Sequence, residues 1–424
     1  MSHFVPIVFL LFLMSQSCYF VANLAFLWLR TTPRRRVKER PPNRYRQIHT
    51  LVPAYRERRE VLESTLERIT AGDYPLDRIT VYLIYEDDDK VVTSYADSVA
   101  DSLPDLDIRL VEVRKDDPVW EEVTRLRWTG LAFPRGKARA LTYALYKLDL
   151  DEVVTVLDSD TAIPTDLFSL GVVGLEEYEI VQAKQTVANR RAGWLPLLEA
   201  MGIAAWSQNI YERAATWPYQ LLGKGYFIEA STLYDLIGWD PYEATEDLAL
   251  GIDAYAKGYR LGIIDRYVED FCPPKSRDWI RQKRRWVSGP YSVFVSSKLS
   301  VEDRIRFATY ALINQVTAVV NVIGVPTGFY ALAHLALYGP LPIPEPFGVI
   351  LAINLFTWTL YSVDMYRAAD RAIAFESRAE KWRYFLVSNP FTQALYSTLW
   401  AIPILQAVKL RLQRRAVGFT VTPK

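Results

Sequence analysis

The sequence predicts an α/β domain with a mixed, mostly parallel sheet, attached to transmembrane helices. Short β-rich runs alternate with amphipathic helical patterns through residues 45 to 290, and long uncharged apolar runs lie on both sides of that region. Such a βαβ alternation is typical of a parallel sheet whose ligands bind at the carboxyl ends of the strands. We therefore expect a functional site at acidic residues that directly follow strands.

The first apolar run, Phe4 to Leu29, is free of Lys, Arg, Asp and Glu over 26 residues. A helix of that length can cross a hydrocarbon core of about 30 Å. A cleaved signal peptide is the alternative, but the basic residues follow the run, in RRRVKER, and no Lys or Arg precedes it. Because Lys and Arg favour the cytoplasmic side, residues 1–30 are predicted as a transmembrane helix with the next region in the cytoplasm.

Two later apolar runs, Phe307 to Tyr338 and Phe347 to Val363, are joined by the Pro-rich GPLPIPEP. They predict a helical hairpin across the bilayer over residues 305–365, with its first helix bent near Gly324 and Pro326. The domain is thus expected to belong to an integral membrane protein of the cell membrane, with its catalytic part in the cytoplasm.

The segment Tyr384 to Val408 is also uncharged, but it contains Asn389-Pro390, Gln393 and Pro403. The basic KLRLQRR follows it, and a crossing here would place that tail outside, against the usual charge distribution. Residues 384–408 are therefore interpreted as a helix lying in the cytoplasmic interface, followed by a basic tail over 409–424.

The β-rich runs between the membrane segments predict strands at Gln47 to Val52, Ile79 to Tyr85, Ile108 to Val113 and Val153 to Leu157. Between the first two, the apolar residues Val61, Leu62, Thr65, Leu66 and Ile69 are spaced for one face of a helix. The region contains neither GxGxxG nor GxxxxGK[ST], which excludes the dinucleotide fingerprint and the P-loop.

Composition narrows the chemistry. The 50 Lys and Arg residues are balanced by 49 Asp and Glu, so no basic excess indicates a nucleic-acid partner. Two cysteines and three scattered histidines argue against a disulfide framework, a Cys-rich or His-based zinc site and a Ser-His-Asp triad. Carboxylates are therefore expected to carry the chemistry.

Two groups of carboxylates are candidates. In VVTVLDSDT, Asp158 and Asp160 follow a strand at positions i and i+2, where their side chains can converge on Mg²⁺ or Mn²⁺. One alternative is a solvated turn without a functional role. Another is a phosphatase DxDx[TV] motif, but its fifth position is Ala162 in this chain, which disfavours it. In EATEDLALG, Glu246 and Asp247 open a helix, where they are either partners of the helix dipole or a general base.

A third motif, RQKRRWVSG at residues 281–289, combines cationic side chains with Trp286. It could anchor the chain to anionic lipid or bind a diphosphate and a sugar, because Arg makes two-pronged contacts with phosphate.

Taken in order, DSD, TED and Q-x-x-R-W ahead of membrane helices resemble the membrane-integrated family-2 glycosyltransferases, the cellulose, chitin and hyaluronan synthase group. The resemblance extends to VPAYRE, IYEDDD, Gly136-Lys137-Ala138 and the final FTVTPK, which is similar to a gating-loop motif of cellulose synthases. It implies a GT-A type domain over residues 45–290.

The resemblance also implies roles for individual residues. Asp158 and Asp160 would hold the metal, and Asp247 would be the base that deprotonates the acceptor. The donor would be bound by Tyr55, Glu57, Asp87, Lys137, Asp158, Gln282 and Arg285, the acceptor by Trp286 and Glu246, and the gating loop would contain Phe419, Val421, Thr422 and Lys424.

Some positions depart from the family pattern. Asp88 is an alternative to Asp87, because the motif reads Glu-Asp-Asp-Asp where the family usually has two Asp. Gly223-Lys224-Gly225 replaces a Gly-Thr-Gly or Gly-Ser-Gly loop, and Glu229 stands where Arg is common. The identity of the acceptor therefore stays open.

The implied activity is inverting, metal-dependent transfer from a nucleotide-diphosphate sugar, expected to be UDP-linked, to a glycan acceptor at the membrane. We expect a processive β-glycan synthase, with transfer to a lipid-linked acceptor and an inactive GT-A scaffold as alternatives. Three spans are few for a polar polymer tunnel, so self-association or accessory subunits would have to complete it.

Overall fold

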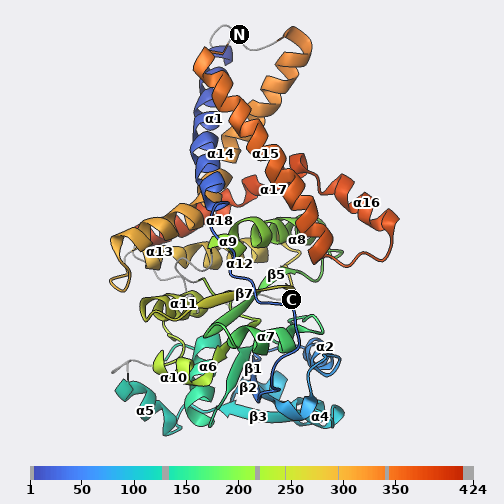
Figure 1. Cartoon of the computed structure of the whole chain (residues 1–424), viewed down its shortest axis with the longest axis vertical. Coiled ribbons are helices and arrows are strands. Elements are labelled where there is room, and N and C mark those ends of the chain that lie inside the picture. The colour runs from blue at the N-terminus through green and yellow to red at the C-terminus, as the bar shows by residue number, and fades with distance from the viewer. Residues whose placement is uncertain are drawn as a thin grey trace.

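The computed structural model describes residues 4–126, 133–214, 220–243, 245–294, 296–339 and 343–413. A sheet domain lies at one end of the molecule and three long helices extend from the other (Figure 1). The predicted class, an α/β domain with a mostly parallel sheet and transmembrane helices, is confirmed. The expected gating residues Phe419, Val421, Thr422 and Lys424 lie outside the described residues.

The sheet has seven strands in the order β3-β2-β1-β4-β6-β5-β7. β6 runs antiparallel to β4 and β5, and the other neighbouring pairs are parallel. The strands are β1 (Ile48–Pro53), β2 (Ile79–Glu86), β3 (Asp107–Val113), β4 (Val153–Val156), β5 (Ile180–Val187), β6 (Tyr226–Glu229) and β7 (Leu261–Asp270). The four predicted strands match β1 to β4 to within one residue at each end.

Helices cover both faces of the sheet, because each face is apolar. One buried cluster joins β1 and β2 to Leu62 and Leu66 of α2 and to α7, and the other joins β1 and β4 to α6 and α11. The helices of this domain are α2 (Arg59–Thr70), η1 (Leu76–Arg78), α3 (Lys90–Thr93), α4 (Ala96–Ser102), α5 (Val119–Leu126), α6 (Lys137–Lys147), α7 (Leu167–Leu175), α10 (Ala230–Asp235) and α11 (Glu246–Ala256).

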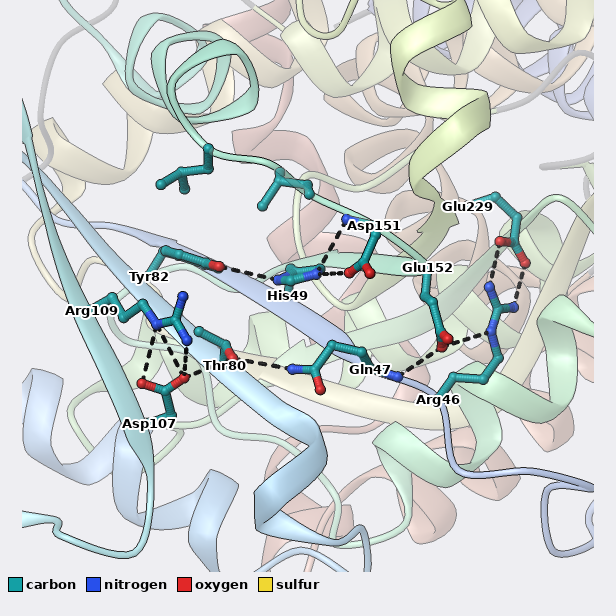
Figure 2. A network of polar contacts seen from close by, with 12 residues as sticks. Arg46, Gln47, His49, Thr80, Tyr82, Asp107, Arg109, Asp151, Glu152 and Glu229 are labelled. Atoms are coloured by element: carbon teal, nitrogen blue, oxygen red, sulfur yellow. Dashed lines mark hydrogen bonds and ion pairs between the residues drawn. The ribbon is translucent and has the colours of Figure 1, made fainter.

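Polar side chains tie the strands together at the amino-terminal edge of the parallel strands (Figure 2). Arg46 donates two hydrogen bonds to Glu229, at 2.6 and 2.7 Å, and His49 contacts Asp151 at 2.6 Å. Glu229 pairs in register with Val153, the first residue of β4. The Glu at this position therefore holds the edge of the sheet opposite to the one that carries Asp158.

Three helices are long and apolar enough to cross a membrane: α1 (Phe4–Leu29), α14 (Val301–Tyr338) and α15 (Glu345–Ala372). They coincide in sequence with the predicted N-terminal span and the predicted hairpin. Pro326 lies inside α14, and the bend expected near it stays a prediction.

The predicted single interfacial helix is instead divided into α16 (Arg378–Val387), α17 (Pro390–Leu399) and α18 (Ala401–Leu412). The first break falls where Pro390 lacks an N–H and disfavours helix in the residue before it. Asn389 then caps α17, with its side chain accepting from the backbone N–H of Phe391 at 2.9 Å and of Thr392 at 3.1 Å.

A layer of shorter helices lies between the sheet and the long helices (Figure 1). It consists of α8 (Trp194–Trp206), the π-helical turn η2 (Ser207–Tyr211), α9 (Glu212–Ala214), α12 (Ser276–Ser288) and α13 (Pro290–Val293). α8 packs against β5 and α15, and α12 packs against α18. These contacts place the carboxyl edge of the sheet next to the membrane helices.

Candidate active site

One cavity of about 1500 Å³ is lined by residues of the sheet domain and of all three long helices. It contains most of the predicted site: Tyr55, Glu57, Lys137, Asp158, Asp160, Glu246, Asp247, Gln282, Arg285 and Trp286. Asp87 is exposed and is not among the lining residues, whereas Glu86 and Arg135 are. The alternative, Asp88, is exposed and forms an ion pair with Arg135 at 2.5 Å.

Asp158 lies two residues after the end of β4, and its carboxylate forms ion pairs with two lysines. The Nζ of Lys137, at the start of α6, lies 2.5 Å from one carboxylate oxygen, and the Nζ of Lys224 lies 3.1 Å from the other. Asp160 is 5% exposed and lines the same cavity. The DSD motif is therefore brought to the site, but with Lys side chains beside its first carboxylate.

Gly223-Lys224-Gly225 forms a tight loop beside Asp247. Gly223 and Gly225 have φ of +77° and +65°, and a Cβ on Gly223 would lie only 2.9 Å from Asp247 Oδ2. Glycine at residue 223 thus allows the backbone to approach the expected base. Lys224 Nζ also contacts Asp270 at 2.5 Å, so this departure from the family pattern is part of the site.

Two glutamines of β5, which the sequence did not indicate, hold this loop. Gln182 Nε2 donates to the carbonyl of Lys224 at 2.8 Å, and Gln185 Nε2 donates to the carbonyl of Leu222 at 2.7 Å. Because buried amides keep their partners, these contacts fix where the Lys224 side chain begins.

The pKa values of the carboxylates are raised mainly by burial. Burial, with the charge of Asp247 as the second cause, raises the pKa of Glu246 to about 7. Burial also raises the pKa of Asp247, against the opposing effects of Lys137 and Arg285. For Lys224, burial favours the neutral amine, but Asp270 and Asp158 outweigh it and raise the pKa, so the ammonium stays charged.

The Q-x-x-R-W motif lies on α12, and its Gln282, Arg285 and Trp286 all line the cavity. Between them, Lys283 is completely buried, with its Nζ 2.8 Å from Gln282 Oε1 and 3.5 Å from the centre of the Trp286 ring. Such a distance fits a cation–π contact. Lys283 therefore contacts both Gln282, which is predicted to bind the sugar donor, and Trp286, which is predicted to bind the acceptor.

Glu199 of α8 forms an ion pair with Lys283 from the other side. The same carboxylate accepts hydrogen bonds from Trp279 Nε1 and from Tyr396 of α17, the latter at 2.8 Å. One buried carboxylate thus joins α8, α12 and α17. Sequence reasoning missed Glu199, although it is the single charged residue of the apolar run Trp194–Trp206, and a lone carboxylate in such a run is a signal of a buried, paired charge.

The carboxylates of the cavity supply some, but not all, of the oxygen ligands that a hard divalent cation needs. Asp158 and Asp160 offer oxygen ligands at the cavity wall, but the described residues contain no group of three or more His, Cys, Asp or Glu that could hold a metal alone. The remaining ligands would have to come from the substrate, as is usual for Mg²⁺ bound through phosphate oxygens.

A mixed sheet of this order, with carboxylates at its carboxyl edge and an Arg- and Trp-bearing helix across the cavity, defines a GT-A type transferase domain. The family model of the glycosyl transferase family group 2 matches residues 153–363. The chain belongs to the family 2 glycosyltransferases.

Among curated proteins, the chain is 24% identical over 255 residues to the beta-monoglucosyldiacylglycerol synthase of Synechocystis sp.. The match covers 59% of this chain and 49% of that protein, so the chain spans about half the length of this relative.

Among solved structures, the chain is similar to mannosyltransferase PcManGT from Pyrobaculum calidifontis in complex with GDP-Man and Mn²⁺. The TM-score is 0.55 at 19% identity, covering 94% of this chain and 98% of the other. TarS 1–349 from S. aureus, solved with UDP-GlcNAc, gives a TM-score of 0.39 at 14% identity over 88% and 94% of the two chains. The first of these likenesses supports the fold assigned above.

Proposed function

We propose that the protein transfers a sugar, with inversion, from a nucleotide-diphosphate sugar to a hydroxyl group of a membrane lipid. The observation that carries this proposal is the single cavity, because it joins Asp158, Asp160 and Asp247 to apolar residues of the three long helices. The hydroxyl group of a lipid acceptor in the bilayer could reach Asp247 without the lipid leaving the membrane. The relative from Synechocystis, named for a glycosyldiacylglycerol product, supports the same acceptor class.

In this proposal Asp247 takes the proton from the acceptor hydroxyl. Its burial raises its pKa, which brings the carboxylate closer to the affinity a general base needs near neutral pH. Attack on the anomeric carbon breaks its bond to the diphosphate, so an α-linked donor gives a β-linked product.

The departing diphosphate is stabilised by positive charge. Lys137, Lys224 and Arg285 all line the cavity, and both lysines lie within 3.1 Å of Asp158. We assign a bound Mg²⁺ or Mn²⁺ to Asp158 and Asp160, where it would neutralise charge on the phosphate oxygens. Gln282 and Arg285 contact the diphosphate, and Trp286 offers the ring face away from Lys283 to the acceptor side.

A processive β-glycan synthase is the second candidate. It is favoured by Trp286, which lines the cavity one helical turn from Gln282 and would form a platform for a newly added sugar. Both candidates have the same donor and base, and they differ in what occupies the rest of the cavity.

The test is an incubation of the full chain, in vesicles, with a panel of UDP- and GDP-sugars, Mg²⁺ or Mn²⁺, and diacylglycerol. We expect one donor to give a lipid product one sugar heavier by mass spectrometry, and excess chelator to remove this turnover. Long glycan chains at early time, beside unused lipid, would replace the lipid proposal by the processive one. Release of nucleotide diphosphate without any sugar-bearing product would contradict both.

A further inference from the structure

The cavity that holds the catalytic carboxylates continues between two of the transmembrane helices. On α14 it is lined by Gly328, Leu332 and Leu335, and on α15 by Leu351 and Leu355. These are aliphatic or bare positions of helices that are apolar enough to cross a membrane. This part of the cavity therefore offers an apolar surface at the depth of the bilayer.

The gap between α14 and α15 is backed by α1. α1 packs closely against both helices, whereas α14 and α15 make at most slight contact with each other within the described residues. Two polar pairs fix this arrangement: Tyr19 donates to Asn321 of α14 at 2.5 Å, and Asn23 donates to Asn354 of α15 at 2.9 Å. Hydrogen bonds between helices in lipid hold them at set positions, so α1 keeps the gap open.

Aromatic rings cross the gap where α17 meets the two helices. Phe391, in the first turn of α17, lies 6.4 Å from Phe329 of α14 and 5.5 Å from Trp358 of α15, between ring centres. All three residues line the cavity, and their exposed fractions are 50%, 41% and 40%, respectively. The rim of the gap is thus apolar and accessible from the surrounding solvent, which for these helices is lipid.

We propose that the gap between α14 and α15 is the binding site for the apolar chain of the acceptor lipid. The chain would lie against α1 and between Leu332 and Leu355, with the lipid hydroxyl directed along the cavity toward Asp247. This inference rests on the proposed lipid acceptor. A polar glycan fits the gap poorly, because its hydroxyls need hydrogen-bond partners. Asn23, Asn321 and Asn354 also line the cavity here, but they already bond to one another or to Tyr19, Gln16 and Ser397.

Two glycines provide a matched pair of variants. A Cβ added at Gly328 or at Gly348 of α15 meets no atom within 4 Å, so a larger side chain can be placed at either position without a clash at its root. Gly328 lines the cavity, whereas Gly348 is exposed and is not among the lining residues. Both lie inside helices, where leucine is a better helix former than glycine.

The experiment compares Gly328→Leu, Gly348→Leu and the unmodified protein on two acceptors with the same headgroup, dioleoylglycerol and the shorter dioctanoylglycerol. We expect Gly328→Leu to lose about tenfold or more in kcat/KM on the long-chain acceptor and to change little on the short one. Gly348→Leu should match the unmodified protein on both. Equal kcat/KM of Gly328→Leu and Gly348→Leu on dioleoylglycerol would overturn the assignment of the gap.

A second measurement is independent of turnover. A diacylglycerol with a photoreactive group in its acyl chain is cross-linked to the unmodified protein, and the labelled peptides are mapped by mass spectrometry. Labels at Leu332 and Leu355 are expected, with fewer in Gly328→Leu. Labels confined to the outward-facing Val349 would overturn the proposal. Should the unmodified protein elongate only a soluble glycan, the proposed function itself fails, whereas a lipid product with no label in the gap refutes the chain site alone.

Discussion

Asp247 combines burial, a neighbouring carboxylate and the nearby charges of Lys137 and Arg285. If it accepts the acceptor proton, Asp247→Asn keeps the shape and hydrogen bonding of the side chain but removes the base. We expect transfer to fall by about 10² or more while donor binding, measured by calorimetry, stays unchanged. Asp235→Asn, an exposed residue paired with Lys257, is the matched control. A parental rate in Asp247→Asn would leave this residue as a partner of the helix dipole.

Glu246 allows a prediction about stability and pH. Its pKa is about 7 in the folded protein against an ordinary value of 4.5, so the folded state binds the proton more tightly than the unfolded state. Below about pH 4.5 Glu246 is protonated in both states and its titration does not change the stability. As pH rises from there to about 7, the free energy of unfolding falls by about 3 kcal/mol.

Glu246→Gln removes this group from titration. The melting temperature of the unmodified protein should therefore decrease relative to that of Glu246→Gln as pH rises from about 4.5 to above 7, in a thermal unfolding series across that range. Asp247 remains in both proteins, and because its charge contributes to the raised pKa of Glu246, the difference between them reports the titration of the two neighbouring carboxylates as a pair. Parallel melting curves at every pH would show that Glu246 is not strained by its burial.

Much of the site could be predicted from the sequence, because its residues fall in short motifs in a recognisable order. Asp158, Asp160, Asp247, Arg285 and Trp286 all line the cavity as expected. The contacts that position them could not be predicted. Lys224 reaches Asp158 across 66 residues of sequence, and Glu199 reaches Trp279 across 80. No local pattern encodes such pairs, since they depend on how the elements pack.

At the scale of elements, the ion pair between Glu199 and Lys283 connects α8, α12 and α17. Removing one partner of a buried pair leaves an unpaired charge and costs about 3–5 kcal/mol, whereas replacing both can be neutral. We expect Glu199→Gln to lower stability by that amount in chemical unfolding, and Glu199→Gln/Lys283→Met to recover most of it. The Gln side chain still offers an oxygen to Trp279 and Tyr396.

The double variant also separates stability from positioning. Lys283 donates to Gln282 and places its charge over the ring of Trp286, and methionine supplies neither the hydrogen bond nor the charge. If these contacts position the donor and acceptor groups, kcat/KM should stay at least tenfold below that of the unmodified protein although stability returns. Recovery of both together would reduce the pair to a purely structural element.

The predicted elements differ in how strongly the sequence marks them. β2 and β4 are nearly continuous runs of apolar and β-branched residues, as expected for strands buried on both faces, and β1 follows the same pattern after His49 and Thr50. β5 was not predicted, because Gln182, Lys184 and Gln185 interrupt its apolar pattern. They are buried because the two glutamines bond to the 222–225 loop, while Lys184 bonds to Gln208 and pairs with Glu212 and Asp265. The interfacial segment was predicted as one helix because it is uncharged from Tyr384 to Val408, although the backbone breaks at Asn389-Pro390.

At the scale of the whole molecule, the distribution of basic residues predicts the orientation in the membrane. RRRVKER follows α1, RQKRR precedes α14, and KLRLQRR begins at the end of α18, whereas the GPLPIPEP turn between α14 and α15 has no Lys or Arg. Because positive residues favour the cytoplasmic side, we propose that residues 30–306 and the tail after residue 409 are cytoplasmic and that 339–346 face outward.

Cysteine labelling can test this orientation with little background. Cys272 is buried and Cys18 is exposed, so Cys18→Ser gives a host with no accessible thiol among its own cysteines. Glu345→Cys in the turn and Leu412→Cys at the end of α18, where the side chain is 81% exposed, add one probe each. A membrane-impermeant maleimide added to intact cells should label Glu345→Cys alone, and Leu412→Cys only after lysis. Labelling of Leu412→Cys in intact cells would mean that the segment from α16 to α18 crosses the bilayer, which would overturn its interfacial position and its packing against α12 of the cytoplasmic domain.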